Sequence, residues 1–168
     1  MSSIGASGAA AGGELEERVD LSAETDAKLE QSATLAQAGQ IKEALALLAA
    51  LEKRCRVGND SPSLVRVCEA SLQYCKDAGD DELLITTLET LSTKRSQKTK
   101  AVRALVHKAM PWCVVDKYTP VQVEPAQYEA REKLVVALRT ITDGKLFLEA
   151  ERARLTRALA IIKVCSSL

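Results

Sequence analysis

Histidine and cysteine are the side chains of this chain that could carry out catalytic or metal chemistry. His107 is the single histidine and stands between Val106 and Lys108, without a serine or cysteine motif nearby and without an acidic residue close in sequence. A general base needs its partners within hydrogen-bond reach, and often an acid that orients its ring. We therefore expect His107 to be structural or exposed, and the sequence predicts no active site.

The five cysteines do not show the spacing of a metal site. No CxxC pair occurs, and zinc sites use tight pairs of ligands, often with more histidine than this chain has. Cys68 and Cys75 are seven residues apart, so they lie on one helix face as small buried hydrophobes. Phosphate-binding glycine loops are also missing. We predict no cofactor and no metal, and a reducing location in the cytoplasm and nucleus.

The charges of the chain balance at 23 basic and 23 acidic residues, which gives no global attraction to nucleic acid or to a membrane surface. No apolar run approaches the roughly 20 residues of a membrane span. Between Thr90 and Val115, however, only basic charges occur. This stretch is either a patch for an acidic protein surface or a solvated corner between helices, and nucleic acid is the weaker partner. Its charged residues are Lys94, Arg95, Lys98, Lys100, Arg103 and Lys108.

The segment from Thr142 to Lys163 carries ordered charges on a long helix. Glu149 and Arg152, and likewise Glu151 and Arg154, stand three residues apart, a spacing at which helix side chains meet. At 100° per residue, Glu151 and Arg154 fall inside the apolar arc of this helix. The arc is formed by Phe147, Leu148, Leu155, Ala158, Leu159, Ile161 and Ile162.

Two interpretations of these charges remain open. Glu151, Arg152 and Arg154 are either exposed intrahelical pairs or polar groups that are buried against a neighbouring helix. The position on the arc favours burial. Alanine in place of Arg154 should then destabilise the fold, whereas alanine in place of Arg18 should not. A helix that packs through a polar contact favours an assembly component over a catalyst.

The remaining sequence predicts an all-α fold. Alanine and leucine dominate, and aromatic residues make up 3% of the chain. Ala38-Gly39 and Ala78-Gly79 mark similar turns 40 residues apart, a distance typical of helical-hairpin repeats, and Asp143-Gly144 marks a third turn. We expect an α-solenoid of antiparallel, tetratricopeptide-like hairpins with about seven helices over residues 21–168. Residues 1–20 should form a disordered tail.

Turn signals place the helices within that solenoid. Ser22 should cap the first helix, and Pro62 suits the first turn of the third. Pro111 should stop or kink the fifth helix, and residues 117–125 form the longest irregular link. The expected helices run from Ser22 to about Gln37, from Gln97 to about Met110, from about Ala126 to Ile141 and through the segment that ends at Lys163. Apolar stripes at Ile41–Leu51, Leu64–Cys75 and Leu84–Leu91 mark the other three helices.

Two stretches, GKLFLEAERARLTRALAIIK and LSTKRSQKTKAV, closely resemble the N-terminal helical region of a known family. It is the family of non-ATPase regulatory subunit 12, a PCI-containing subunit of the 26S proteasome lid. Members continue through further helices into a PCI winged-helix module, so the resemblance implies a helical domain that is incomplete at its C-terminus, before the PCI module. A chain of 168 residues should then self-associate or be degraded, and should not join proteasomes stoichiometrically.

The resemblance implies a non-catalytic scaffold that acts in ubiquitin-dependent protein degradation. Its implied partners are other lid subunits and the core particle, with no nucleic acid, membrane or small-molecule substrate. The candidate contact residues are Glu151, Arg152, Arg154, Lys94, Arg95 and Lys98. One alternative is a PCI-type subunit of the COP9 signalosome. Another is a free tetratricopeptide-like module that binds peptides, which would need a concave groove lined by Lys, Arg or Asn from successive first helices.

Overall fold

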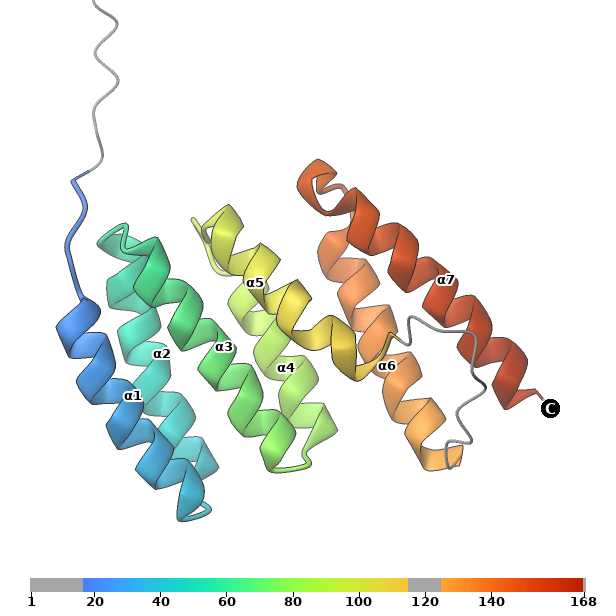
Figure 1. The fold of residues 1–168 in the computed structure, drawn as a ribbon, viewed down its shortest axis with the longest axis horizontal. Coiled ribbons are helices and arrows are strands. Elements are labelled where there is room, and N and C mark those ends of the chain that lie inside the picture. The colour runs from blue at the N-terminus through green and yellow to red at the C-terminus, as the bar shows by residue number, and fades with distance from the viewer. Residues whose placement is uncertain (1–16, 115–124, 168) are drawn as a thin grey trace, which may run out of the picture.

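The computed structural model describes residues 17–114 and 125–167, which form an elongated stack of helices (Figure 1). Within these ranges there is no strand, so the all-α prediction is confirmed. There are also two 3₁₀ turns. The first, η1 (Met110–Trp112), follows the fifth α-helix, and the second, η2 (Leu146–Leu148), lies between the sixth and the seventh. The α-helices are α1 (Ser22–Gln37), α2 (Ile41–Val57), α3 (Ser61–Asp77), α4 (Asp81–Ser92), α5 (Thr99–Ala109), α6 (Pro125–Thr142) and α7 (Glu149–Ser166).

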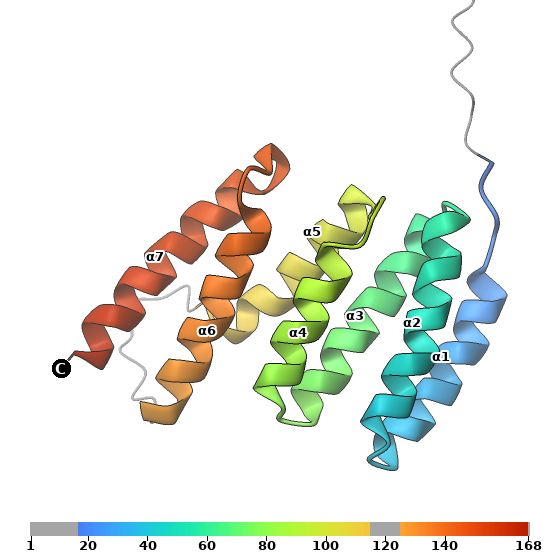
Figure 2. The same ribbon diagram turned by 180° about the vertical axis from the view of Figure 1, so that it is seen from behind.

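Successive helices run antiparallel and form two layers. Helices α1, α3, α5 and α7 lie in one layer, and α2, α4 and α6 lie in the other, as the two opposite views show (Figures 1 and 2). Helix α3 packs on α2, α4 and α5, whereas α7 packs mainly on α6. Each helix thus contacts near neighbours in sequence, which is the arrangement of an α-solenoid. The predicted architecture is confirmed.

Glycine makes the three predicted turns possible. Gly39, Gly79 and Gly144 have φ values of +79°, +69° and +67°. In this left-handed region an L-residue with a Cβ is strained, whereas glycine is not. Each glycine follows the end of a helix and lets the chain reverse at once, so the antiparallel pairs begin at these positions.

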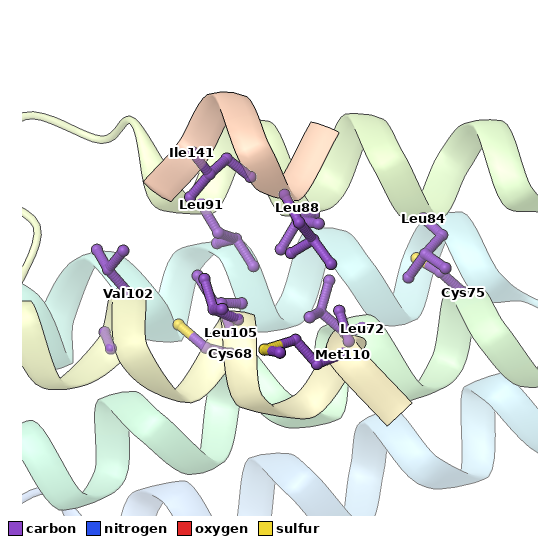
Figure 3. Close-up of a cluster of buried hydrophobic side chains, with 14 of the residues drawn as sticks. Cys68, Leu72, Cys75, Leu84, Leu88, Leu91, Val102, Leu105, Met110 and Ile141 are labelled. Carbon is purple, nitrogen blue, oxygen red and sulfur yellow. The ribbon is translucent and has the colours of Figure 1, made fainter. Parts of the chain in front are cut away.

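The core follows the apolar stripe of α3. Leu64, Val67, Cys68, Leu72 and Cys75 are all fully buried. They recur at three- and four-residue intervals, which places them on one helix face. Figure 3 shows how part of this stripe meets the leucines of α4 and α5. This packing holds the central helices in fixed positions and therefore positions the surface side chains discussed below.

Helix α1 is joined to the stack through polar side chains. Its buried residues are Thr25 and Ser32, whereas its apolar side chains are at most half-buried. The Ser32 hydroxyl lies 2.9 Å from the Tyr74 hydroxyl of α3, and Thr25 Oγ1 lies 3.9 Å from Cys55 Sγ of α2. A polar first helix suits the end of a solenoid, where one face meets water.

The start of α1 differs from the prediction. Ser22 is the first helical residue and does not cap the helix; its N–H instead donates to Asp20 Oδ1 at 3.0 Å. Residues 17–20, placed in the expected tail, run beside the α2–α3 loop, where the Val19 N–H donates to the Gly58 carbonyl at 2.8 Å. The rest of that predicted tail, residues 1–16, lies outside the described residues.

Two helix boundaries also need correction. Helix α5 begins at Thr99, two residues later than expected, and Pro111 stops it as predicted, within the turn η1. Of the expected link at 117–125, residues 117–124 lie outside the described residues, and Pro125 is the first residue of α6. The seventh helix begins at Glu149, because Phe147 and Leu148 belong to the turn η2, and it continues to Ser166.

Candidate interaction surface

A polar contact joins helix α5 to helix α7. Glu151 Oε1 lies 2.7 Å from His107 Nε2, across 44 residues of sequence. Arg103 stands one helical turn before His107, so it reaches the same neighbour. Its guanidinium lies 5.6 Å from the centre of the Phe147 ring, and Nη2 donates to the Phe147 carbonyl at 3.4 Å. Two α5 side chains therefore hold the start of α7.

The environment of Glu151 favours its charged form. Its side chain is 17% exposed, while that of His107 is 52% exposed. The hydrogen bond with His107 lowers the pKa of Glu151 below its ordinary value of 4.5, although partial burial opposes this. The expectation that Glu151 pairs with a polar group on an adjacent helix is met. This polar group is the imidazole of His107 on α5.

Arg152 stabilises the turn between α6 and α7. Its Nη1 lies 2.6 Å from Asp143 Oδ1 and donates to the Arg139 carbonyl at 3.2 Å. The carbonyl belongs to the last turn of α6, where carbonyl groups lack helical partners. Arg152 is therefore engaged within the chain, and the predicted pair with Glu149 is not what the structure shows.

Arg154 is exposed, so the expectation of its burial is wrong. The position of Arg154 on the helical arc overstated its burial, because the buried side chains of α7 are those of Leu155, Ala158 and Ile162, and Arg154 lies outside this set. Arg154 instead lines a surface pocket of about 290 Å³. The other lining residues are His107, Met110, Pro111 and Val114. An exposed cation beside an apolar floor is suited to an acidic group on another protein.

The basic stretch does not form one continuous patch. Lys94 lines a groove between α2 and α4, and Lys98 donates to Asn59 in the α2–α3 loop. The carbonyl of exposed Arg95 accepts from Arg56 Nη1 at 2.8 Å. These three residues are spread around the α4–α5 connection, where two of them bond to the preceding hairpin.

The later basic residues stack on aromatic rings. Lys108 Nζ lies 6.0 Å from the centre of the Trp112 ring, and Lys76 Nζ of α3 lies 5.7 Å from the same ring. Cation–π contacts of this kind fix the lysine heads near the surface without neutralising them. Arg103 of α5, which contacts Phe147, and Arg154 of α7, which lines the pocket beside His107, form a cationic face between α5 and α7.

Catalytic and metal chemistry finds little support in the part of the chain that is described. No group of three or more His, Cys, Asp or Glu residues stands there as a potential metal site. Burial raises the pKa of the Cys68 thiol to about 12, and likewise that of Cys113, so neither is a thiolate at neutral pH. Among the described residues, no helix is both long enough and apolar enough to cross a membrane.

Several residues of this surface could not be predicted as partners. Asp60 is completely buried and accepts from Leu21 N at 2.9 Å and from Arg18 at 3.2 Å, which are 39 and 42 residues away in sequence. Glu52 and His107 also gain their partners from distant positions. One local signal for a buried polar group was Glu52, which interrupts the apolar stripe of its helix. Without knowledge of the packing, such a charged side chain is expected to point into solvent.

A stack of antiparallel helix pairs, in which several polar side chains join neighbouring helices, defines a helical-repeat protein. Comparison with known proteins identifies the particular family. Residues 43–166 match the family model described as PSMD12/CSN4, N-terminal, which covers well over half of the chain. The chain belongs to this family, and the match spans six of the seven described α-helices.

Curated relatives narrow the comparison. The 26S proteasome non-ATPase regulatory subunit 12 of Dictyostelium discoideum is 37% identical over 144 residues, which are 86% of this chain and 30% of the relative. Homolog A of the same subunit in Arabidopsis thaliana is 33% identical over 129 residues, 77% of this chain and 27% of the relative. The regulatory subunit rpn501 of Schizosaccharomyces pombe is 32% identical over 139 residues, 82% and 29% respectively. The chain thus spans less than a third of the length of these relatives.

Proposed function

We propose that this chain is the N-terminal helical-repeat part of a subunit of the 26S proteasome lid. It acts as a non-catalytic scaffold in ubiquitin-dependent protein degradation, in the cytoplasm and nucleus. Its partners are other lid subunits and the core particle. The relatives support this proposal, because all those described above are named as regulatory subunits of the proteasome.

One structural observation carries the scaffold proposal. On α7, Leu155 and Ile162 pack into the stack, whereas Ile161 and Val164 are 48% and 63% exposed. A solenoid grows by laying a further helical element on the outer face of its last pair. Exposed apolar side chains on that face fit such an element better than they fit solvent.

The cationic face between α5 and α7 provides the second contact of the proposed scaffold. Arg154 holds an exposed charge beside a partly apolar pocket, which suits an acidic protein surface. Within the candidate set, Arg154 and Arg95 are the exposed cations, whereas Arg152, Lys94 and Lys98 are partly buried. Glu151 contributes indirectly, because it fixes the position of His107.

The COP9 signalosome remains the nearest alternative, since the matching family model covers PSMD12 and CSN4 together. The names of the relatives favour the proteasome over it. A free tetratricopeptide-like peptide-binding module is less favoured still, because those relatives are named as subunits of an assembly. No described cluster of catalytic groups supports an enzyme.

An affinity tag at the N-terminus of the endogenous protein tests the proposal. Native purification followed by mass spectrometry should recover subunits of the proteasome lid, and an immunoblot should report the length of the tagged protein. A tagged protein as long as its relatives should be recovered at equal stoichiometry with the lid subunits, whereas a tagged chain of 168 residues should be recovered below that stoichiometry. Recovery of signalosome subunits would support the alternative. A tagged protein that is found with neither complex would refute the scaffold proposal.

A paired substitution tests the contact face directly. Ile161→Glu together with Val164→Glu places two charges on the outer face of α7, so lid subunits should be lost from the purified complex. Val57→Glu is the matched control, because Val57 is 70% exposed but lies at the end of α2. Equal recovery with both variants would show that the outer face of α7 is not a contact.

A further inference from the structure

A groove runs between α2 and α4, in the layer that faces the viewer in Figure 2. Helix α3 packs on α5 in the opposite layer, while α2 and α4 make little direct contact, so the groove lies between them. Its free volume is about 160 Å³, the room of roughly five waters at about 30 Å³ each, and this suits one side chain. It is lined by Leu45, Ala49, Glu52, Ser71, Thr86, Thr87, Thr90, Leu91 and Lys94.

Glu52 gives this groove an unusual chemical feature. Its side chain is 1% exposed, and its Oε1 accepts from Arg56 Nε at 2.8 Å and from Gln97 Nε2 at 3.2 Å. Its second oxygen, Oε2, is buried and has no hydrogen-bond partner among the described residues. A buried carboxylate oxygen without a donor is unfavourable, and such groups commonly mark the place of a ligand or partner.

We propose that the α2–α4 groove receives a tyrosine side chain from a partner protein. The leucine, alanine and threonine methyl groups of the walls contact its ring, and its hydroxyl donates to Glu52 Oε2. An O–H donor on a carboxylate forms a strong, charge-assisted hydrogen bond, and tyrosine is enriched among the residues that dominate protein interfaces.

The charges around the groove favour a neutral donor over a cation. Arg56 already balances the charge of Glu52, and Lys94 places a second positive charge at the groove. A lysine from a partner would be repelled by Lys94. An arginine would need both carboxylate oxygens for its paired geometry, and Oε1 already has two donors. A phenol adds no charge and needs one oxygen only.

Small probes can test the groove on the 168-residue chain by NMR. We would titrate p-cresol, which carries the phenol of tyrosine, and 4-methylanisole, which keeps the ring and the oxygen but has no proton to donate. p-Cresol should shift the amide signals of residues 45–52 and 86–94 with a Kd on the order of millimolar. 4-Methylanisole should bind about tenfold more weakly, because it brings a second acceptor to Oε2.

Variants of the groove make this test specific. In Glu52→Gln an amide donor replaces Oε2, so the preference for p-cresol over 4-methylanisole should vanish. Ala49→Phe should block binding of both probes, whereas Ala50→Phe, at an exposed position that does not line the groove, should leave binding unchanged. The Ala49 variant keeps the test valid if Glu52→Gln does not fold.

Three results would overturn the proposal. The first is equal affinity of the unmodified chain for p-cresol and 4-methylanisole, since the carboxylate would then not be engaged. The second is tighter binding of n-butylammonium, the head of lysine, which would assign the groove to a cation. The third is the absence of localised shifts with all three probes, which would mean that Glu52 is satisfied within the chain.

Discussion

Glu151 and Arg154 stand three residues apart on α7 but have different environments. Glu151 is largely buried against α5 and contacts His107, while Arg154 is exposed at the pocket beside it. For single residues, the position on the apolar arc of a helix does not decide which side chain contacts a neighbouring element. The direction of the side chain toward that element decides it. The pairs His107–Glu151 and Arg18–Asp60 show this most clearly.

The His107–Glu151 contact should give the fold a dependence on pH. Because the pKa of Glu151 is lowered in the folded chain, its ionised form contributes stability above its ordinary value of 4.5, and this contribution is lost as the pH falls through the lowered pKa. Glu151→Gln should therefore lower the free energy of unfolding at pH 7 by less than about 1 kcal/mol, since His107 is exposed. Urea titrations should show this difference disappearing toward pH 3, and the exposed Glu149→Gln should show none.

Asp60 should contribute far more to stability than any charge on α7. It is completely buried, and although burial raises its pKa, hydrogen bonds from Ser63 and the Leu21 N–H hold the pKa below its ordinary 3.8. Asp60→Ala leaves these donors without a partner, which costs about 2–4 kcal/mol. Asp26→Ala is the control, because Asp26 and its partner Arg66 are both exposed. Thermal melts with equal small shifts would contradict this prediction.

The structure also reverses the expected effects of two arginine substitutions on stability, because burial of the partner decides the effect. The sequence predicts a larger loss of stability for Arg154→Ala than for Arg18→Ala. In the structure, Arg18 contacts buried Asp60, whereas Arg154 is exposed. These partners could not be predicted, because 42 residues separate Arg18 from Asp60, and 44 separate His107 from Glu151. Only the packing of the helices brings them together.

Helical elements were predicted with more success than their partners. Glycine, proline and apolar spacing are local signals, and they correctly placed the turns at Gly39, Gly79 and Gly144. The start of α7 was misplaced, because a 3₁₀ turn and an α-helix share the same residue preferences over three positions. A glycine permits a turn through its own backbone conformation and needs no distant partner, so the sequence alone is sufficient to predict the turn.

Substitution of a turn glycine tests how much such an element contributes. A Cβ on Gly79 would meet no atom within 4 Å, so the only penalty of Gly79→Ala is its positive φ. We expect a loss of about 1 kcal/mol in the free energy of unfolding, and a smaller loss for Gly79→Asn, since asparagine tolerates this region. A chemical denaturation series checks both. An alanine variant as stable as the original chain would mean that the turn adjusts freely.

At the scale of the whole molecule, the outer face of α7 should control self-association. Ile161 and Val164 are exposed there, and two such faces can cover each other. Sedimentation velocity should show concentration-dependent association of the 168-residue chain, and Ile161→Glu with Val164→Glu should abolish it. Val57→Glu should not. A chain that stays monomeric at high concentration would exclude this contact.

The five thiols should also divide into two classes. Cys165 is half-buried, whereas Cys55, Cys68, Cys75 and Cys113 are buried, and burial raises the pKa of each of these four. At pH 8 one thiol should therefore react rapidly with Ellman's reagent, and the other four only after denaturation. More than one rapid equivalent would contradict the buried positions.

These buried thiols sit at different heights of the stack, with Cys55 on α2, Cys68 and Cys75 on α3, and Cys113 after η1. A solenoid opens section by section, because each section contacts only its neighbours. The slow labelling rate of each thiol therefore reports how often its own section unfolds under native conditions. The native chain contains its own set of probes for mapping where the stack frays first, and mass spectrometry can read them without a single substitution.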